Sequence, residues 1–448
     1  MTLKNPAYLI PVLLFSFFAA SQENLEVSKG KLGGQWRTFY MATFNKDSLK
    51  DFEALATGGY IKYTYDFNKN LSAGGALYSS LNTKIQDLTK PDPTTGRTSR
   101  YEEGLFDLLN PSRDLLVILG EMYLDYHTDF HRVKVGRMKI KSPFLNGQDG
   151  RMIPTLVQGA WYTYSPGRSQ FQFGVLNEIA PRSGSEFFSI GESIGIYPSG
   201  RTLSGAPSMY EGNTNSDYVI IASASMPLGK GIKTTLWNYY TDNVFNTFYL
   251  KPEFDLSKNW NLQLEWVHQN RVGEGGNDEE ALRYFTANTS DVIGTRLAYS
   301  WNRSSLSLAW NHILPHGQFL FPREWGREFI FSFQKRERSE GSADNHSLVL
   351  YYDQRSRIER LGLDLQSIIS VGRHWKAPVT NPELNKYAFP DYTHINLDLL
   401  FDIDGLKGLS PEVLITGKVS HGDFPDNPNF IFNKTDLLHV NLVLNYNF

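Results

Sequence analysis

The sequence alternates between apolar and polar residues along most of its length, as a β-strand does when its two faces meet different surroundings. In the stretch 32–44, Leu32, Trp36 and Tyr40 share one face, while Arg37 lies on the other. The same alternation recurs in the stretches 116–126, 293–301 and 395–402. We find no convincing helix-period segment of useful length and no Pro/Ser-rich linker, so the sequence predicts a single all-β domain.

Three features favour a transmembrane β-barrel over a soluble β-sandwich. The expected strands run for about 10 residues or more, which is the tilted span of a bilayer. Tight turns and long connections alternate strictly, as they do in outer-membrane barrels. Aromatic residues gather at strand ends, as interfacial girdles require. These aromatic residues are Tyr63, Tyr65, Tyr126, Tyr162, Tyr164, Trp260, Trp301 and Tyr446.

The long connections are expected at 82–113, 178–216, 270–290 and 372–392. Counting strands forward and backward along the chain places 314–343 in one further long outer loop, so that Phe329–Phe333 is not a wall strand. Both chain ends are expected in the periplasm, which requires an even number of strands. The sequence therefore predicts an antiparallel barrel of about 18 strands with long outer loops that fold into the lumen.

The composition excludes several classes of protein. The chain has 44 Lys+Arg against 47 Asp+Glu, a net charge of −3, so it lacks the basic excess of a nucleic-acid binder. It contains no cysteine, and therefore no disulfide or thiolate metal site. No phosphate loop, zinc-binding helix or nucleophile elbow is present. We expect no cofactor, no metal site and no enzymatic activity; Pro315 keeps His312 and His316 from sharing one helical face.

The first 21 residues are typical of a secretory signal peptide. Lys4 is their only charge, an apolar stretch follows, and Ala19 and Ser21 supply the small residues before the expected cleavage site. After residue 20, no apolar run approaches the ~18–20 residues of a membrane-spanning helix. We therefore expect residues 1–21 to direct export, and residues 22–448 to form the barrel in the outer membrane of a Gram-negative bacterium.

The C-terminal segment ends in an alternating strand whose last residue is Phe448. A closing strand with a terminal aromatic residue looks like the recognition signal of the machinery that assembles outer-membrane barrels. We therefore expect Phe448 to be an assembly signal. The other expected partners are the lipid bilayer, lipopolysaccharide and small solutes.

Several motifs resemble those of the OprD family of outer-membrane porins, in order and in spacing. The main ones are Val135–Met138, Ser142–Asn146, Asp149–Pro154 and Gln158-Gly159. Supporting pieces are Gly58-Gly59, Glu121–Tyr126, Pro181–Ser183, Trp237–Tyr240, Phe319–Gly326, Arg336–Asp344 and Asp404–Leu409. The resemblance implies an 18-stranded porin, a monomer rather than a trimer, that passes small hydrophilic solutes such as amino acids, small carboxylates or peptides.

Selectivity in a porin comes from pore width and from opposed charges at the narrowest point. The residues predicted for this constriction lie in the long outer connections. They are Asp149, Arg151, Arg182, Ser183, Ser185, Arg323, Glu324 and Arg327. The competing interpretation is that these arginines pin the loops to the wall or bridge lipopolysaccharide.

A second group of charged residues alternates with apolar residues along the strands, which places it on the lumen face. These residues are Arg37, Lys62, Glu121, Asp125, Lys134, Glu265 and Arg296. Their signs are mixed and do not form the continuous arginine ladder of the OprD family, so they do not fix the substrate class.

The main alternative function is that of a barrel enzyme, such as a lipid hydrolase. Such an enzyme needs a serine and a histidine on the lipid-facing rim. His268 and His439 are the histidines considered for this role, and neither has an obvious serine partner in the sequence.

Overall fold

The computed structural model describes residues 30–147, 150–197 and 200–448. Asp149 and the expected signal segment 1–21 lie outside these residues. The first strands are β1 Gly30–Asn45, β2 Phe52–Asp66, β3 Leu71–Asn82, β4 Leu115–His127, β5 His131–Met138, β6 Leu156–Tyr164, β7 Gln170–Ala180, β8 Phe188–Ser189, β9 Val219–Gly229 and β10 Ile232–Thr241. The remaining strands are β11 Phe245–Asp255, β12 Trp260–Arg271, β13 Thr289–Trp301, β14 Ser304–Ile313, β15 Asn345–Ile358, β16 Leu363–Trp375, β17 Asp391–Ile403, β18 Leu409–His421 and β19 Leu437–Asn447.

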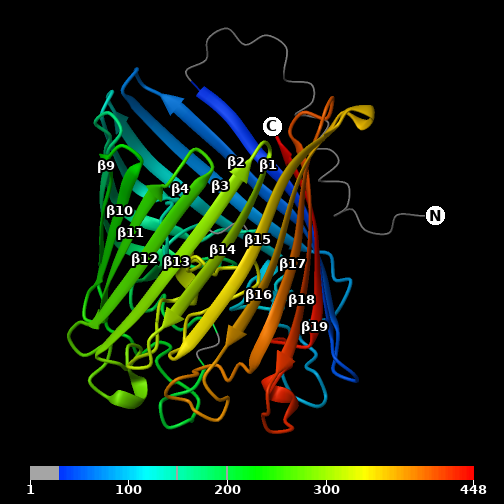
Figure 1. Ribbon diagram of the computed structural model, residues 1–448. Helices are drawn as coiled ribbons and strands as arrows, with labels where there is room; N and C mark the ends of the chain where they lie inside the picture. Colours follow the sequence, from blue (N-terminus) through cyan, green and yellow to red (C-terminus); the bar gives the residue numbers. More distant parts are fainter. Residues whose placement is uncertain (1–29, 148–149, 198–199) are drawn as a thin grey trace.

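The strands form one closed antiparallel barrel (Figure 1). Each wall strand pairs with its neighbours in sequence, and β1 pairs with both β2 and β19, which closes the wall. The two-residue strand β8 pairs only with the end of β7, while β7 and β9 pair directly. Leaving β8 aside, 18 of the 19 strands make the wall, so the prediction of about 18 strands is confirmed.

The two faces of the wall differ as the alternation predicted. Along β19, Leu438, Leu442 and Leu444 are exposed on the outer surface, whereas the intervening His439 and Asn441 are buried inside. In a closed barrel, the backbone N–H and C=O groups of every wall strand are hydrogen-bonded to the two neighbouring strands. A bilayer requires this of any backbone that spans it, because lipid offers no hydrogen-bond partners. Within the described residues, no helix is long and apolar enough to cross a membrane.

The alternation along β4 changes phase at a β-bulge, and here the sequence-based assignment of faces was wrong. The pairing with β3 shifts between Ala76 and Leu77, so that Gly120 has no partner there. Leu116 and Ile118 are consequently buried on the inside, although Met122, on the other side of the bulge, is 56% exposed on the outside. A single extra residue is enough to exchange the faces of a strand.

The connections at the two ends of the barrel differ in length (Figure 1). At one end are turns such as 230–231 and 302–303; at the other end are long loops such as 83–114, 181–218 and 314–344. The expected strict alternation of tight and long connections fails at two places on the long-loop end. The connections 46–51 and 242–244 there are short.

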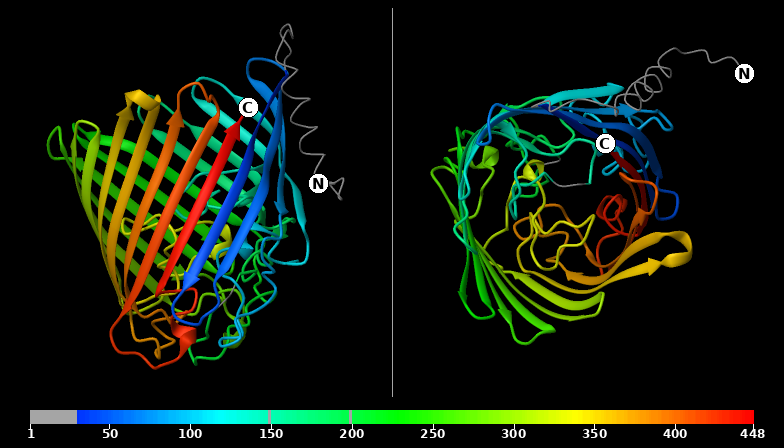
Figure 2. Two further views of the ribbon diagram at one scale, coloured as in Figure 1. Left: turned by 90° about the vertical axis from the view of Figure 1, so that its right-hand side faces the viewer. Right: turned by 90° about the horizontal axis from the view of Figure 1, so that it is seen from above.

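The connection between β14 and β15 is one long loop without a wall strand, as the parity count predicted. Viewed along the barrel axis, this yellow segment lies inside the ring of strands (Figure 2). It touches the wall from within, since the main-chain N–H of Phe331 donates to Glu265 Oε1 on β12 at 2.7 Å. The loop therefore narrows the lumen.

Aromatic side chains hold this loop against one side of the lumen. Phe321 and Trp325 of the loop pack with Phe245 on β11, and Phe144 of the connection 139–155 packs with Tyr239 on β10. All five side chains are buried. Burying side chains of this size stabilises the folded loops by about 1.5–3 kcal/mol each. One side of the lumen is thus filled by packed aromatic side chains.

Candidate functional site

The predicted constriction residues lie in three loops that meet inside the barrel. Arg151 belongs to the connection 139–155, Arg182 and Ser183 to 181–218, and Arg323, Glu324 and Arg327 to 314–344. All six side chains are buried. The loops are joined by hydrogen bonds such as the one from Thr155 Oγ1 to the carbonyl oxygen of Glu324, at 2.9 Å.

Arg151 is held mainly through its backbone. Arg37 on β1 donates from Nη1 to the carbonyl oxygen of Arg151 at 2.8 Å. The Arg151 guanidinium itself donates to the neighbouring carbonyl of Gly150 at 2.7 Å. It also lies against Gly104, where a Cβ atom would come within 2.5 Å of Arg151 Nε. The side chain is therefore confined by packing, while its charge remains available.

Arg182 joins two loops. Its Nη1 donates to the carbonyl oxygens of Arg323 and Gly326, and its guanidinium lies 4.4 Å from the centre of the Tyr197 ring. The Tyr197 hydroxyl donates in turn to the carbonyl oxygen of Arg182. Arg182 thus has the pinning role of the competing interpretation, and it also carries a charge without a carboxylate partner among the described residues.

Arg323 and Glu324 are bound to specific partners. Arg323 Nε forms an ion pair with Glu340 at 2.8 Å and lies over the ring of Tyr387. The carboxylate of Glu324 accepts hydrogen bonds from the main-chain N–H groups of Gly195 and Tyr197, at 3.1 and 2.9 Å. Both residues lie near the other arginines, but their contacts are those of loop anchors.

Sequence reasoning missed Arg336, which belongs to the same group. Its side chain is buried and donates to Asn441 Oδ1 on β19 at 2.9 Å. Arg327 donates to the carbonyl oxygen of Glu337 at 2.9 Å. The repeated arginines in 323–338 were a visible signal, but nothing in the sequence told which of them lack an acidic partner.

We call Arg151, Arg182, Arg327 and Arg336 the arginine cluster. Within the described residues, none of the four has a carboxylate oxygen within the 4.0 Å of an ion pair, whereas Arg323 and Arg338 do. The Nε atoms of Arg182 and Arg336 are buried and lack a hydrogen-bond partner in the same part of the chain. Unpaired buried donors are costly, so the cluster is poised to bind an anion.

The electrostatics agree with this geometry. Burial lowers the pKa of Arg151 well below its usual value, and the positive charges of Arg336 and Arg182 lower it further. Burial also lowers the pKa of Arg327, with contributions from Arg338 and Arg182, and lowers the pKa of Arg182 to about 10. The charges thus repel one another within a low-dielectric environment, and an anion among them would reduce that repulsion.

The two predicted serines take different positions. Ser183 is buried, has a φ of 61°, and donates from Oγ to the carbonyl oxygen of Gly104. Ser185 lies outside the arginine cluster, where Arg113 Nη1 donates to its Oγ at 3.0 Å and its Oγ donates to Asp107 at 3.2 Å. Ser183 therefore supports the backbone near Arg151, while Ser185, in the same connection, binds the neighbouring loop 83–114.

The predicted wall charges form local networks. Lys62 Nζ lies 2.6 Å from Glu121 Oε2, and Asp125 lies 2.5 Å from Arg132 and 3.5 Å from Lys134.

The three other predicted wall residues bind neutral groups. Glu265 is buried and accepts hydrogen bonds from Tyr249 and Asn311. Arg296 donates to Ser307, and Arg37 binds Asn445 as well as Arg151. Most of these charges are therefore balanced locally, in contrast to the arginine cluster.

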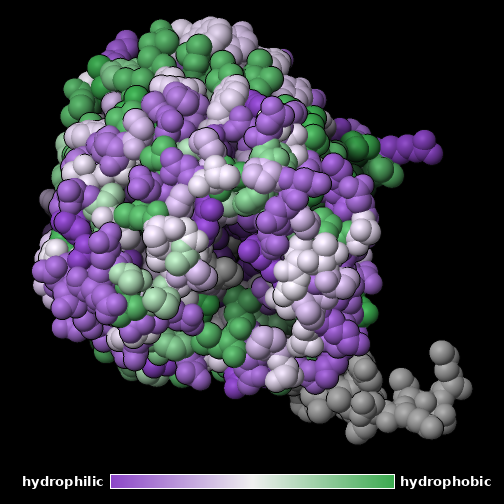
Figure 3. Space-filling view, turned by 90° about the horizontal axis from the view of Figure 1, so that it is seen from below, coloured by the Kyte–Doolittle hydropathy of each residue, from purple (hydrophilic) through white to green (hydrophobic). Residues whose placement is uncertain are grey.

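The long-loop end is hollowed. Viewed from that end, a depression opens near the middle of the surface, between largely hydrophilic residues (Figure 3).

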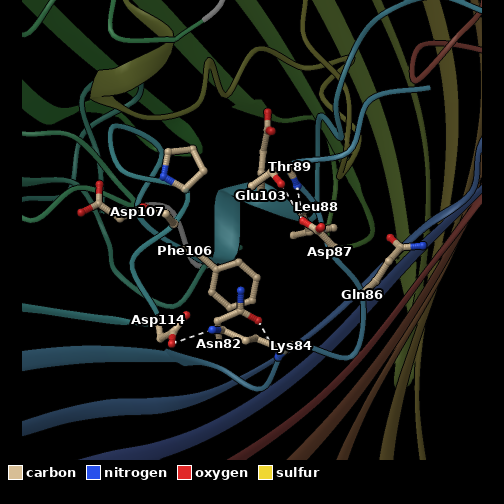
Figure 4. Close-up of a pocket in the computed structure, with 12 residues that line it drawn as sticks. Asn82, Lys84, Gln86, Asp87, Leu88, Thr89, Glu103, Phe106, Asp107 and Asp114 are labelled. Carbon is tan, nitrogen blue, oxygen red and sulfur yellow. Dashed lines mark hydrogen bonds and ion pairs between the residues drawn. The ribbon is translucent and has the colours of Figure 1, made fainter. Parts of the chain in front are cut away.

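A separate cavity of about 440 Å³ lies along the connection between β3 and β4 (Figure 4). Glu103 and Asp107 line it, and Lys84 pairs with Asp114 there at 2.8 Å. Burial raises the pKa of Glu103 to about 7.

The fold of this chain is similar to that of solved structures, although its sequence is not. No protein-family model and no curated protein matches the sequence. Solved structures match almost over the whole chain, at low identity. OccAB4 of Acinetobacter baumannii has a TM-score of 0.68 at 14% identity and covers 95% of this chain and 100% of its own. OccD3 (OpdP) of Pseudomonas aeruginosa has a TM-score of 0.65 at 14% identity, covering 94% and 91%.

Pseudomonas aeruginosa OpdK, solved with vanillate, has a TM-score of 0.65 at 15% identity and covers 94% of this chain and 98% of its own. These neighbours are outer-membrane porins of the OprD type, which is the family that the sequence motifs resemble. At this level of identity the likeness concerns the fold, and it confirms the OprD-type barrel predicted from the sequence.

Proposed function

We propose that this protein is a passive outer-membrane channel of the OprD type, with a preference for small solutes that carry a carboxylate. The fold supports a channel, since its structural neighbours are outer-membrane porins. The solute preference rests on the arginine cluster. All four of its guanidinium groups are buried.

The arginine cluster suits a carboxylate for two physical reasons. A guanidinium presents parallel N–H donors that match the two oxygens of a carboxylate. In addition, the loops exclude much of the water around these groups, so each charge acts at a lower dielectric constant than in bulk water. A passing anion is therefore attracted, and a cation of the same size is repelled.

A structural neighbour agrees with this preference, since OpdK was solved with vanillate, a small organic anion. That observation concerns OpdK. For the present chain, the support comes from Arg151, Arg182, Arg327 and Arg336, none of which has a carboxylate oxygen within 4.0 Å among the described residues.

Planar-bilayer recording of the purified full chain tests both parts of the proposal. A channel gives steady conductance, and a salt gradient then gives a reversal potential on the anion-selective side. Adding benzoate should reduce the chloride current more than adding benzylammonium, a cation of similar size, reduces the potassium current. The absence of steady conductance would refute the channel, whereas cation selectivity would refute only the solute preference.

The lipid-hydrolase alternative has one supporting contact. His268 Nδ1 lies 2.9 Å from Asp291 Oδ1, which is half of a Ser-His-Asp arrangement. However, Asp291 is shared with Trp266 and His316, and no serine hydroxyl within the described residues is hydrogen-bonded to His268. His439 binds Thr43 instead, at 2.7 Å. We therefore give the channel priority; a phosphatidylcholine hydrolysis assay on the same preparation tests the alternative.

A further inference from the structure

Two histidines lie face to face at the long-loop end of the wall. His312 on β14 and His346 on β15 are directly opposite in the strand register. Their ring centres are 3.7 Å apart and their planes differ by 19°. Asp344 immediately precedes β15, and its Oδ1 lies 3.9 Å from His312 Nε2. Asp344 adopts the left-handed conformation, with a φ of 48°.

This group lies on the outer surface of the barrel. Side chains two residues apart share a face of a strand, and Leu308 and Leu348 are both exposed on the outside. His312 and His346 therefore continue the outer face toward the loop end. They are separated from the arginine cluster by the wall, and so they are not part of the proposed solute path.

The chemistry of the three side chains is that of a metal site. His312 Nε2 is buried and has no hydrogen-bond partner among the described residues. Within the same residues, His312 is the one ion-pair partner of Asp344, so no lysine or arginine neutralises this carboxylate. Two imidazoles and one carboxylate suit Zn²⁺, Ni²⁺ or Cu²⁺, whereas Mg²⁺ and Ca²⁺ prefer all-oxygen sites.

We propose that His312, His346 and Asp344 bind a divalent transition-metal ion of the zinc class, with water completing the coordination. The three ligand atoms lie within 4.8 Å of one another. Two nitrogens on one tetrahedral zinc are about 3.3 Å apart, given Zn–N distances of about 2.0–2.1 Å. A rotation of the two partly exposed imidazoles and of the exposed Asp344 side chain would bring the ligands together.

The position of the site gives it a structural consequence. His312 lies two residues before the loop 314–344 that narrows the lumen, Asp344 is the last residue of this loop, and His346 lies two residues after it. A bound metal would therefore fasten the two ends of this loop, which carries Arg327 and Arg336. Metal binding to the folded state also stabilises it by mass action. Zinc outside the cell would thus restrain the constriction loop without entering the lumen.

Zinc titration of the full chain, purified without a histidine tag, tests the proposal by calorimetry. We expect one zinc ion per chain, and no competition from a hundredfold excess of Mg²⁺. His312→Phe keeps a stacked ring but removes the nitrogen ligand. Its affinity should fall at least about tenfold, because even the loss of a residue that only supports a metal ligand costs about 10–100-fold. The zinc affinity of Asp344→Asn should fall as well.

His421→Phe is the matched control, since His421 lies at the same end of the wall, on β18, and its Nε2 lies 2.8 Å from Thr393 Oγ1. Its zinc affinity should equal that of the wild type. Equal affinity in His312→Phe and His421→Phe would overturn the proposal, as would loss of binding in His268→Phe alone.

A second measurement does not depend on binding heats. Zinc should raise the thermal unfolding midpoint of the wild type and of His421→Phe, but not that of His312→Phe or Asp344→Asn. Each variant must first show the compact, heat-modifiable gel mobility of a folded barrel. Equal zinc shifts in all four folded chains would exclude His312 and Asp344 as ligands.

Discussion

Arg37 donates a hydrogen bond from Nη1 to the main-chain carbonyl oxygen of Arg151, over 2.8 Å. Arg37 also binds Asn445 Oδ1 on β19 at 2.6 Å, so one side chain links the closing seam of the barrel to the loop that carries Arg151. The acceptor in that loop is backbone, and substitution of the Arg151 side chain leaves it in place. The charge of Arg151 can therefore be removed without detaching its loop.

Arg151→Ala should lower anion preference with little change in stability. The Arg151 side chain donates only to Gly150 within the described residues, so the free energy of unfolding should change by less than about 1 kcal/mol. The reversal potential under a salt gradient should shift toward that of an unselective pore. Arg151→Lys, which keeps the charge, is the control; a stable Arg151→Ala channel with an unchanged reversal potential would remove Arg151 from the site.

Arg182→Ala should reduce anion preference, with little loss of stability as long as Arg338 is present. Its guanidinium shares the carbonyl oxygens of Arg323 and Gly326 with Arg338. Because either arginine alone can satisfy these acceptors in part, we expect a loss of about 1–3 kcal/mol only when both are removed. Urea unfolding of Arg182→Ala, Arg338→Ala and the double variant measures this coupling. Strictly additive losses would show that the two arginines act independently.

The pH dependence of stability should include a contribution from Glu103. Burial raises the pKa of this loop carboxyl from 4.5 to about 7. The folded state therefore holds the proton more tightly than the unfolded state does. The contribution is complete below about pH 4.5, is lost as the pH rises toward 7, and changes little above that. Unfolding midpoints from pH 4.5 to 8.5 should fall more steeply for the wild type than for Glu103→Gln; parallel curves would contradict the assignment.

Lys335→Met should shift the channel toward cations. Lys335 Nζ lies 2.5 Å from both Asp398 Oδ2 and Glu412 Oε1, so the loop is tied to β17 and β18. Without Lys335 the two carboxylates lose this counter-charge, and the loop loses an anchor. We expect larger current fluctuations and a less anion-selective reversal potential. Lys407→Met, in an exposed turn at the opposite end, removes the same charge and should leave both readouts unchanged.

Gly136→Ala should impair the barrel itself. Gly136 has a φ of 121°, and a Cβ there would lie 2.2 Å from the carbonyl oxygen of Met122. The strained backbone and the clash should cost about 1–3 kcal/mol or more. Gly417→Ala is the control, since a Cβ at Gly417 meets nothing within 4 Å. Gel mobility before and after heating gives the folded fraction, and equal fractions in both variants would contradict the prediction.

The architecture could be predicted from the sequence because it depends on local patterns. In a strand with one lipid face and one aqueous face, apolar and polar residues must alternate with period two. The wall strands can therefore be recognised from the order of residues alone. The even strand count also follows from local features, since each strand carries the chain to the other end of the barrel and each connection turns it back. This is why the loop 314–343 could be identified although Phe329–Phe333 has the composition of a strand.

The details that depend on partners distant in sequence could not be predicted in this way. The bulge at Gly120 exchanges the faces of β4, because its position depends on pairing with β3. Likewise, Arg323 and Arg327 are equivalent by sequence, yet Arg323 has an ion-pair partner, Glu340, whereas Arg327 has none within the described residues.

The sequence by itself therefore determined that this chain forms an even-stranded antiparallel β-barrel, because an apolar and an aqueous surrounding impose alternating residues along each wall strand. Only the tertiary structure decided which charges remain unpaired inside, and that His312 meets His346 rather than His316. Charge balance and metal-ligand geometry depend on distances of a few ångströms between loops and strands far apart in the chain. Those distances are fixed by closure of the barrel and by packing of the loops inside it.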